Sequence, residues 1–190
     1  MIRQATLPLL FVLSPSLQPA AGEILERRLR KAVRRREPIA LGTAAVPYEP
    51  AGRPDESPLR RVLLREEGLE IAITTGTARI LRELDLLVEL DRRHSVAVRM
   101  VVPASKAEDP EPRLRAVGCL AAEGIATRVL VSPVGAETLR YVFEQAVDAG
   151  AQDVEMDTRS LRRGERASQL DIFLRLRLEY GFPRAATGRG

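Results

Sequence analysis

The chain has 190 residues, of which 45% are hydrophobic, 29% charged and 4% aromatic, and its formal net charge at pH 7 is +4. This length and apolar content indicate one globular domain with a core of its own. A single cysteine excludes an internal disulfide, few aromatic rings disfavour a base-stacking surface, and no apolar run is long enough to span a membrane.

Short apolar runs alternate with amphipathic stretches about every thirty residues, the length of one βαβ step. The runs predicted as strands are Leu9–Leu13, Ile39–Thr43, Leu69–Thr75, Ser95–Val102, Ile125–Ser132 and Asp153–Asp157. Helices are predicted over Glu23–Arg36, Leu59–Glu67, the stretch after Thr77, Arg113–Glu123, Glu137–Ala149 and Glu165–Tyr180. This alternation predicts an α/β fold, a parallel sheet wrapped by helices, with any active site at the carboxyl ends of the strands.

Local signals fix several element ends. Thr77 has the chemistry of a helix N-cap, and Gly124 and Gly150 that of helix C-terminal residues. In the last helix we expect an inward face made of Leu170, Phe173, Leu174 and Leu178. Three regions are predicted: an extended segment and loop over residues 1–22, a βα domain over residues 23–180 and a flexible tail over residues 181–190.

Both ends of the chain are basic and the middle is acidic. Residues 23–37 hold seven basic and three acidic side chains, and residues 159–190 hold eight and three. The ordinary explanation of these basic stretches is that they are solvent-exposed helix faces, as charge runs usually are, and we prefer it. The weaker alternative is a nucleic-acid surface. Its candidate contacts are Arg27, Arg28, Arg30, Lys31, Arg34 and Arg35.

Small and polar residues follow several predicted strands. Glycine lets a ligand approach the backbone, and a helix N-terminus after such a turn can hold an anion. The spacing fits neither the dinucleotide-binding nor the Walker phosphate fingerprint, so ordinary turn chemistry is the competing explanation. The candidate ligand-binding residues are Gly42, Thr43, Thr74, Thr75, Gly76, Ser132 and Asp157.

Few other residues suggest chemistry. Asp157 or Glu49 could serve as a general base, although a solvated loop acid is the usual case. His94, the only histidine, falls at a strand start, so we expect a structural role. Cys119 lies opposite the apolar stripe of its helix, and no cluster of side chains has metal-ligand spacing.

Five stretches together resemble the spore photoproduct lyase-like branch of the radical SAM superfamily, often labelled DNA repair photolyase. Their order and spacing over residues 7–157 carry the resemblance. The stretches are Glu23–Lys31 (EILERRLRK), Glu37–Pro50 (EPIALGTAAVPYEP), Ile71–Leu87 (IAITTGTARILRELDLL), Arg113–Gly124 (RLRAVGCLAAEG) and Val129–Val134 (VLVSPV).

The resemblance implies a partial (βα)6 barrel. In that family a CxxxCxxC loop after the first strand holds a [4Fe–4S] cluster, whose open iron binds S-adenosylmethionine. Here the first strand and the cysteine loop have no counterpart, and Leu7–Leu13 resembles the extended piece that follows the loop. The family's Asp-Pro-Tyr is Val46-Pro47-Tyr48, and its Thr-Lys-Ser is Thr75-Gly76-Thr77. Cluster irons need thiolates, so we expect no cofactor, metal or catalytic residue in this chain.

The sequence therefore predicts a cytoplasmic, non-catalytic binding or partner module on a radical SAM-like scaffold. Its partner would be a complete radical SAM relative, or a second copy at the sheet edge that the missing strand leaves exposed. One alternative is an N-terminally truncated radical SAM enzyme whose cysteine loop lies upstream. The other is a cluster-independent βα barrel enzyme that uses the strand-end residues for acid–base chemistry.

Overall fold

The computed structural model describes residues 10–11, 27, 30–45, 47–50, 60, 67–103, 108–132, 136–158 and 166–182. Its centre is a six-stranded sheet in which every neighbouring pair of strands is parallel, and the strand order follows the sequence. The strands are β1 (Leu10–Phe11), β2 (Ile39–Leu41), β3 (Glu70–Thr75), β4 (Ser95–Val102), β5 (Ala126–Val131) and β6 (Asp153–Met156). The predicted α/β fold with a parallel sheet is confirmed.

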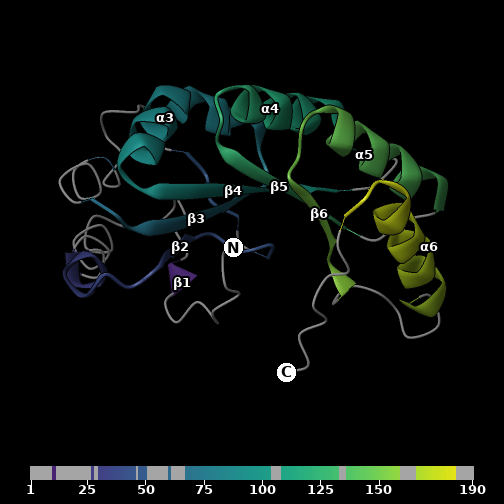
Figure 1. Cartoon of the computed structure of the whole chain (residues 1–190), viewed down its shortest axis with the longest axis horizontal. Coiled ribbons are helices and arrows are strands. Elements are labelled where there is room, and N and C mark those ends of the chain that lie inside the picture. Colours follow the sequence, from purple (N-terminus) through teal and green to yellow (C-terminus); the bar gives the residue numbers. More distant parts are fainter. Residues whose placement is uncertain are drawn as a thin grey trace.

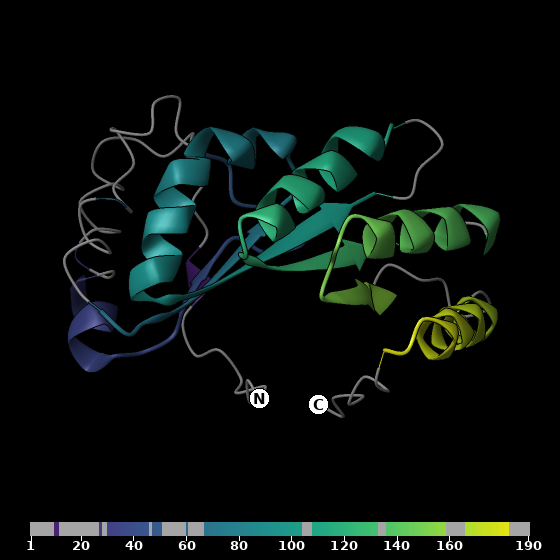
Figure 2. The same ribbon diagram turned by 45° about the horizontal axis from the view of Figure 1, so that its top comes forward.

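Helices follow the strands and lie on the outer side of the curved sheet (Figures 1 and 2). A connection between adjacent parallel strands is right-handed, so successive connections in one direction along the sheet place their helices on one face. The named helical elements are η2 (Ala78–Glu83), a 3-10 helix, and the α-helices α3 (Leu84–Arg93), α4 (Glu111–Ala122), α5 (Ala136–Asp148) and α6 (Arg166–Glu179). A further helical segment covers residues 30–35, before β2.

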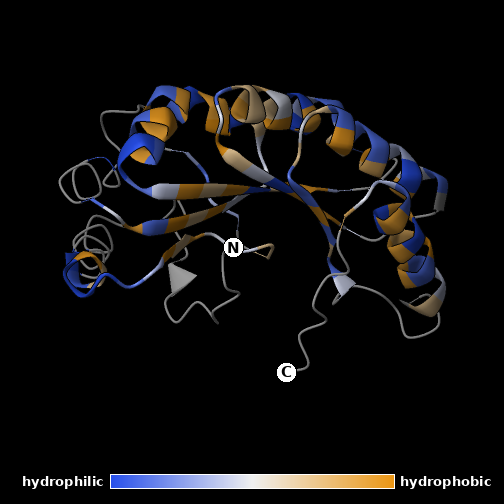
Figure 3. Cartoon of the chain, viewed as in Figure 1, coloured by the Kyte–Doolittle hydropathy of each residue, from blue (hydrophilic) through white to orange (hydrophobic). Residues whose placement is uncertain are grey.

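Alternate residues of each strand face the helices. In β4, Val96, Val98, Met100 and Val102 are at most 1% exposed, while the residues between them are half-buried. Helix residues such as Leu87, Leu90, Val117, Leu120 and Phe143 complete this core. Figure 3 shows hydrophobic and hydrophilic stretches alternating along the helices, as expected where one side of each helix rests on a core.

We call the opposite side of the sheet the open face. Among the described residues, the named helices lie against the outer side and not against this face (Figure 1). Strand register places small, apolar and charged side chains together on it. The open face includes Ala40, Ala72, Thr74, Ala97, Arg99, Val101, Ala126, Arg128, Leu130, Asp153 and Glu155.

The strand predicted near the N-terminus is confirmed at Leu10–Phe11, which pairs with β2 and occupies the edge beside that strand. Thr77 is the expected N-cap, but the first six residues after it form the 3-10 helix η2 before α3 begins. Gly124 and Gly150 follow α4 and α5 with φ values of +82° and +85°. The predicted helix over residues 59–67 lies outside the described residues except for residues 60 and 67, as does most of the segment over residues 1–22.

The expected inward face of the last helix is wrong at one position. Leu178 is 59% exposed, whereas the neighbouring Leu176 and Arg177 are buried. The reason is the contact of α6 with α5, where the Phe143 ring lies 5.8 Å from those of Phe173 and Phe182. Phe182 therefore packs against α5, and the rest of the predicted tail, residues 183–190, lies outside the described residues.

Arg177 joins α6 to the outer edge of β6. Its Nη1 donates hydrogen bonds to Asp153 Oδ1, at 2.7 Å, and to the Val154 carbonyl oxygen. The guanidinium also lies over the Phe173 and Phe182 rings. Because a free sheet edge invites pairing with another chain, this buried arginine protects the β6 side of the sheet. Among the described residues, no helix is long and apolar enough to cross a membrane.

Candidate functional site

Gly42 follows β2 and lets the chain fold back toward β3. Its φ is +74°, and a Cβ atom there would lie 2.3 Å from the Thr74 carbonyl oxygen and 2.4 Å from Tyr48 N. Tyr48 N donates a hydrogen bond of 2.7 Å to that same oxygen, which ties the loop to β3. The space beside Gly42 is therefore filled by the protein's own backbone, not left for a ligand as the sequence suggested.

Thr75 ends β3 on the side of the helices. Its hydroxyl donates to the Tyr48 carbonyl oxygen at 2.8 Å, and the side chain is fully buried. Tyr48 in turn donates from its hydroxyl to Oε2 of Glu83, at 2.9 Å, and both residues are buried. The Thr75 side chain thus lies in the core, and it is not exposed at the carboxyl ends of the strands, where a ligand was expected.

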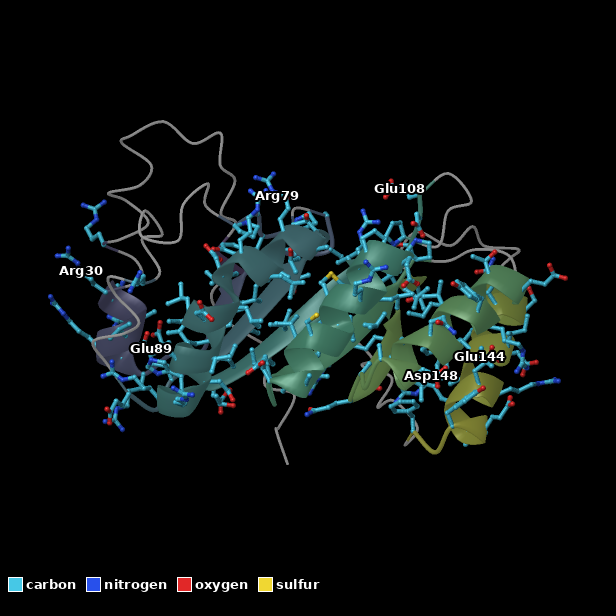
Figure 4. All side chains as sticks on the ribbon, turned by 90° about the horizontal axis from the view of Figure 1, so that it is seen from above. Arg30, Arg79, Glu89, Glu108, Glu144 and Asp148 are labelled. Carbon is cyan, nitrogen blue, oxygen red and sulfur yellow. The ribbon has the colours of Figure 1, made fainter. Side chains whose placement is uncertain are left out.

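Gly76 and Thr77 form the turn that leads into η2. The Gly76 carbonyl oxygen accepts a hydrogen bond of 2.6 Å from Arg113 Nε, and Arg113 Nη2 is paired with Glu108 at 2.9 Å. Thr77 Oγ1 accepts from Arg79 N, so the cap itself already satisfies part of the helix N-terminus. Arg79 and Glu108 project along this same edge of the molecule (Figure 4).

The remaining strand-end candidates lie far apart along the sheet. Thr43 follows β2, Ser132 follows β5 and Asp157 follows β6, and all three are half-buried. Ser132 N donates to Val102 O and Asp157 N to Val131 O, at 3.2 and 3.0 Å, so both continue the parallel ladder. From β2 to β6 is about 19 Å along the sheet at the usual strand spacing. These candidates therefore do not form one compact cluster.

The open face holds a charged cluster that the sequence reasoning missed. Arg99 of β4 and Arg128 of β5 are direct neighbours in register. Both approach one carboxylate from β6: Arg99 Nη2 lies 3.1 Å from Glu155 Oε2, and Arg128 Nη1 lies 3.6 Å from Glu155 Oε1. The three side chains are 41%, 32% and 28% exposed, so solvent reaches the cluster.

One sequence signal could have revealed these residues. In a strand buried on both faces the side chains are nearly all apolar. Arg99 and Arg128 each interrupt an apolar strand, at a position that faces away from the helices. Two interruptions in neighbouring strands indicate that the face they share is not filled by core. Their proximity, however, depends on strand register, which the sequence alone does not supply.

His94 has the structural role that we expected. It is the C-cap of α3 and 7% exposed, and its Nδ1 accepts a hydrogen bond of 3.3 Å from Leu69 N. Ser95 N donates to Leu69 O at 2.8 Å, so this histidine helps to join the starts of β3 and β4. It lies at the amino ends of the strands, away from the edge that follows their carboxyl ends.

The basic segment before β2 presents its charges to solvent. Arg30, Lys31, Arg34 and Arg35 are exposed, whereas Ala32 and Val33 are buried in the core. Arg27 is also exposed, and nothing is described of the Arg28 side chain. Arg30 projects from one end of the molecule (Figure 4). This arrangement fits a solvated helix face, and contact with nucleic acid stays a prediction.

The residues present do not fit an iron–sulfur cluster. The 190 residues hold one cysteine, Cys119, which is half-buried on α4, whereas iron–sulfur clusters are normally held by several cysteine thiolates. Over the described part of the chain, no group of three or more His, Cys, Asp and Glu residues is arranged to hold a metal ion.

No protein-family model matches the chain. Similar curated proteins include an uncharacterised protein of Mycobacterium bovis and uncharacterised proteins of two strains of Mycobacterium tuberculosis, each 29% identical over 160 residues. The match covers 75% of this chain but 47% of each relative, so the chain spans about half the length of the curated relatives it matches. These relatives add neither a substrate nor an activity.

Proposed function

We propose that this chain is a ligand-binding domain built on a radical SAM-like partial βα barrel, and that the domain holds no iron–sulfur cluster of its own. The observation that carries the proposal is the open face. A solvent-accessible cluster of Arg99, Arg128 and Glu155 lies there on a sheet whose named helices pack on the other side. A face with this combination is suited to binding rather than to core packing.

The strand order supports the barrel part of the proposal. A doubly wound sheet reverses its strand order at a switch point, whereas this sheet runs from β1 to β6 without a reversal. It also curves so that the helices lie outside it (Figure 2). Sequential parallel strands with outer helices are the arrangement of a βα barrel, and the open face would correspond to the barrel interior.

The cysteine content supports the cluster-free part. Thiolates are the usual ligands of iron–sulfur clusters, and one half-buried cysteine on an outer helix does not replace three on one loop. The strand-end positions that resemble the family's S-adenosylmethionine region are also occupied differently. Thr75 is bonded within the core, and the Gly76 carbonyl oxygen accepts from Arg113.

Anaerobic reconstitution of the purified chain with iron and sulfide tests this proposal. We expect far less than one cluster per chain, and no difference in iron content between the wild type and a Cys119→Ala variant. S-adenosylmethionine titrated into the reconstituted sample should release no cluster-dependent heat. Stoichiometric iron and sulfide in the wild type would contradict the proposal.

A longer native protein is a second candidate, because the curated relatives are about twice as long as this chain. In that case the domain would contribute the open face to an enzyme whose cysteine loop lies upstream. Reading the DNA before the Met1 codon decides between the two, since an in-frame CxxxCxxC would favour the enzyme. As a separate module, the domain would pair with a complete relative or a second copy at the β1 edge; a purely monomeric sedimentation profile would count against self-association.

A further inference from the structure

The neighbouring arginines on the open face are placed by strand pairing, not by chance contact of flexible side chains. Arg99 and Arg128 are Cα partners in β4 and β5. Like charges directly opposite each other across two strands destabilise a sheet unless an anion lies between or beside them. The fold thus places two guanidinium groups where an anionic partner is needed.

The described residues supply only part of that negative charge. Glu155 is shared by both arginines. The Asp153 carboxylate, which is next to Arg128 in register, is bonded to the buried Arg177. Two guanidinium groups therefore share one carboxylate. In addition, Arg99 Nε is buried and has no hydrogen-bond acceptor among the described residues.

The surroundings of the arginines are small and apolar. One neighbouring row of the open face consists of Ala72, Ala97 and Ala126, and the other includes Val101 and Leu130. Ala72, Ala97, Ala126 and Val101 are half-buried, so they leave a small apolar surface beside the arginines, whereas Leu130 is only 7% exposed. The acidic groups of β6 beside the cluster disfavour a polyanion such as nucleic acid, which binds through many phosphates along a basic surface.

We propose that the open face binds a small organic oxyanion, a phosphate or carboxylate compound, between Arg99 and Arg128. Arginine is suited to this because its planar fork donates two parallel hydrogen bonds to such groups. Glu155 holds the guanidinium groups in place in the absence of ligand and competes with the anion for them. This inference rests on the proposed function and names the ligand class for the same face.

Isothermal titration calorimetry of the full chain at low salt tests the inference, with inorganic phosphate, adenosine 5′-monophosphate and succinate as separate probes. We expect at least one probe to bind with one-to-one stoichiometry, more weakly as salt rises. Binding by the phosphates alone or by succinate alone assigns the oxyanion, and both results support the site. No binding of any probe to the wild type would overturn it.

Variants that each remove one charge, with a control that removes the same charge elsewhere, locate the site. Arg99→Gln and Arg128→Gln should each weaken binding by about tenfold or more, because each removes a charge-assisted pair of hydrogen bonds. Glu155→Gln should strengthen binding, since it removes the competing carboxylate. The control is Arg115→Gln on the exposed side of α4, where Arg115 pairs with Glu111 at 3.5 Å and is 72% exposed. An equal loss in this control would contradict the assignment.

Circular dichroism spectra of all variants should match that of the wild type, which separates loss of binding from loss of fold. The result is also independent of the iron experiment. Anion binding together with stoichiometric iron would refute the cluster-free domain but not the arginine site. Absence of both would refute the arginine site alone.

Discussion

Gly42 shows how a single backbone position controls the loop after β2. The residue combines a left-handed φ of +74° with a close approach to Thr74 O and Tyr48 N. We expect Gly42→Ala to lower the free energy of unfolding by about 2–4 kcal/mol, since it adds a steric clash to the cost of an alanine at positive φ. Urea unfolding followed by circular dichroism measures this change.

Gly68 provides the matched control for Gly42. It has the same φ of +74°, but a Cβ atom there would meet nothing within 4 Å. Gly68→Ala should therefore show only the backbone cost, about 1–2 kcal/mol. Equal losses of stability in the two variants would mean that the contact of the loop with β3 contributes nothing.

Residue-scale predictions succeeded where the signal is local. Thr77 is an N-cap and His94 is structural because each depends on its immediate neighbours in the chain. The hydrogen bond of the Thr75 hydroxyl was not predictable in the same way, because its acceptor belongs to Tyr48, a residue 27 positions away. No local sequence pattern predicts that hydrogen bond, or the one between Tyr48 and Glu83.

At the scale of elements, α6 depends on one buried arginine. Arg177 is 3% exposed and links the helix to Asp153 and to the edge of β6. Arg177→Met should destabilise the protein by about 2–4 kcal/mol, because the carboxylate and the Val154 carbonyl oxygen lose a charged donor. Differences in urea midpoint at constant m-value report the effect.

Arg175→Met on the same helix is the control for Arg177→Met. Arg175 is 77% exposed and pairs with Asp171 one turn earlier, at 2.7 Å. Exposed pairs of this kind contribute little, so the change should stay within about 0.5 kcal/mol. If both variants lost the same stability, the buried link between α6 and β6 would not be what stabilises this end of the sheet.

Strands such as β4 and β5 were predictable because each is a short run rich in β-branched and aliphatic residues, a property that can be read without tertiary contacts. The buried side of the last helix was not predictable from its sequence. An inward arginine and the aromatic contacts of Phe143 with Phe173 and Phe182 decide which side of α6 is buried. Helical spacing alone places leucines such as Leu178 on that side, and the structure exposes it.

For the whole molecule, the alternation of strands and helices was sufficient to predict a parallel sheet with outer helices. It was not sufficient to find the charged cluster. Arg99, Arg128 and Glu155 come from three strands and meet only because the strands pair in register. Among the predicted strand-end candidates, Thr74 is the Cα partner of Arg99, whereas Thr43, Ser132 and Asp157 are spread along the sheet.

We propose that this protein binds a ligand on the open face and does so without an iron–sulfur cluster. Nuclear magnetic resonance of the iron-free chain, titrated with adenosine 5′-monophosphate and followed at the arginine Nε–Hε and backbone amide signals, tests it most directly. We predict that the signals of Arg99 and Arg128 shift first, together with the amides of β4, β5 and β6. Shifts confined to the basic segment over residues 30–35, or to the outer helices, would contradict the account.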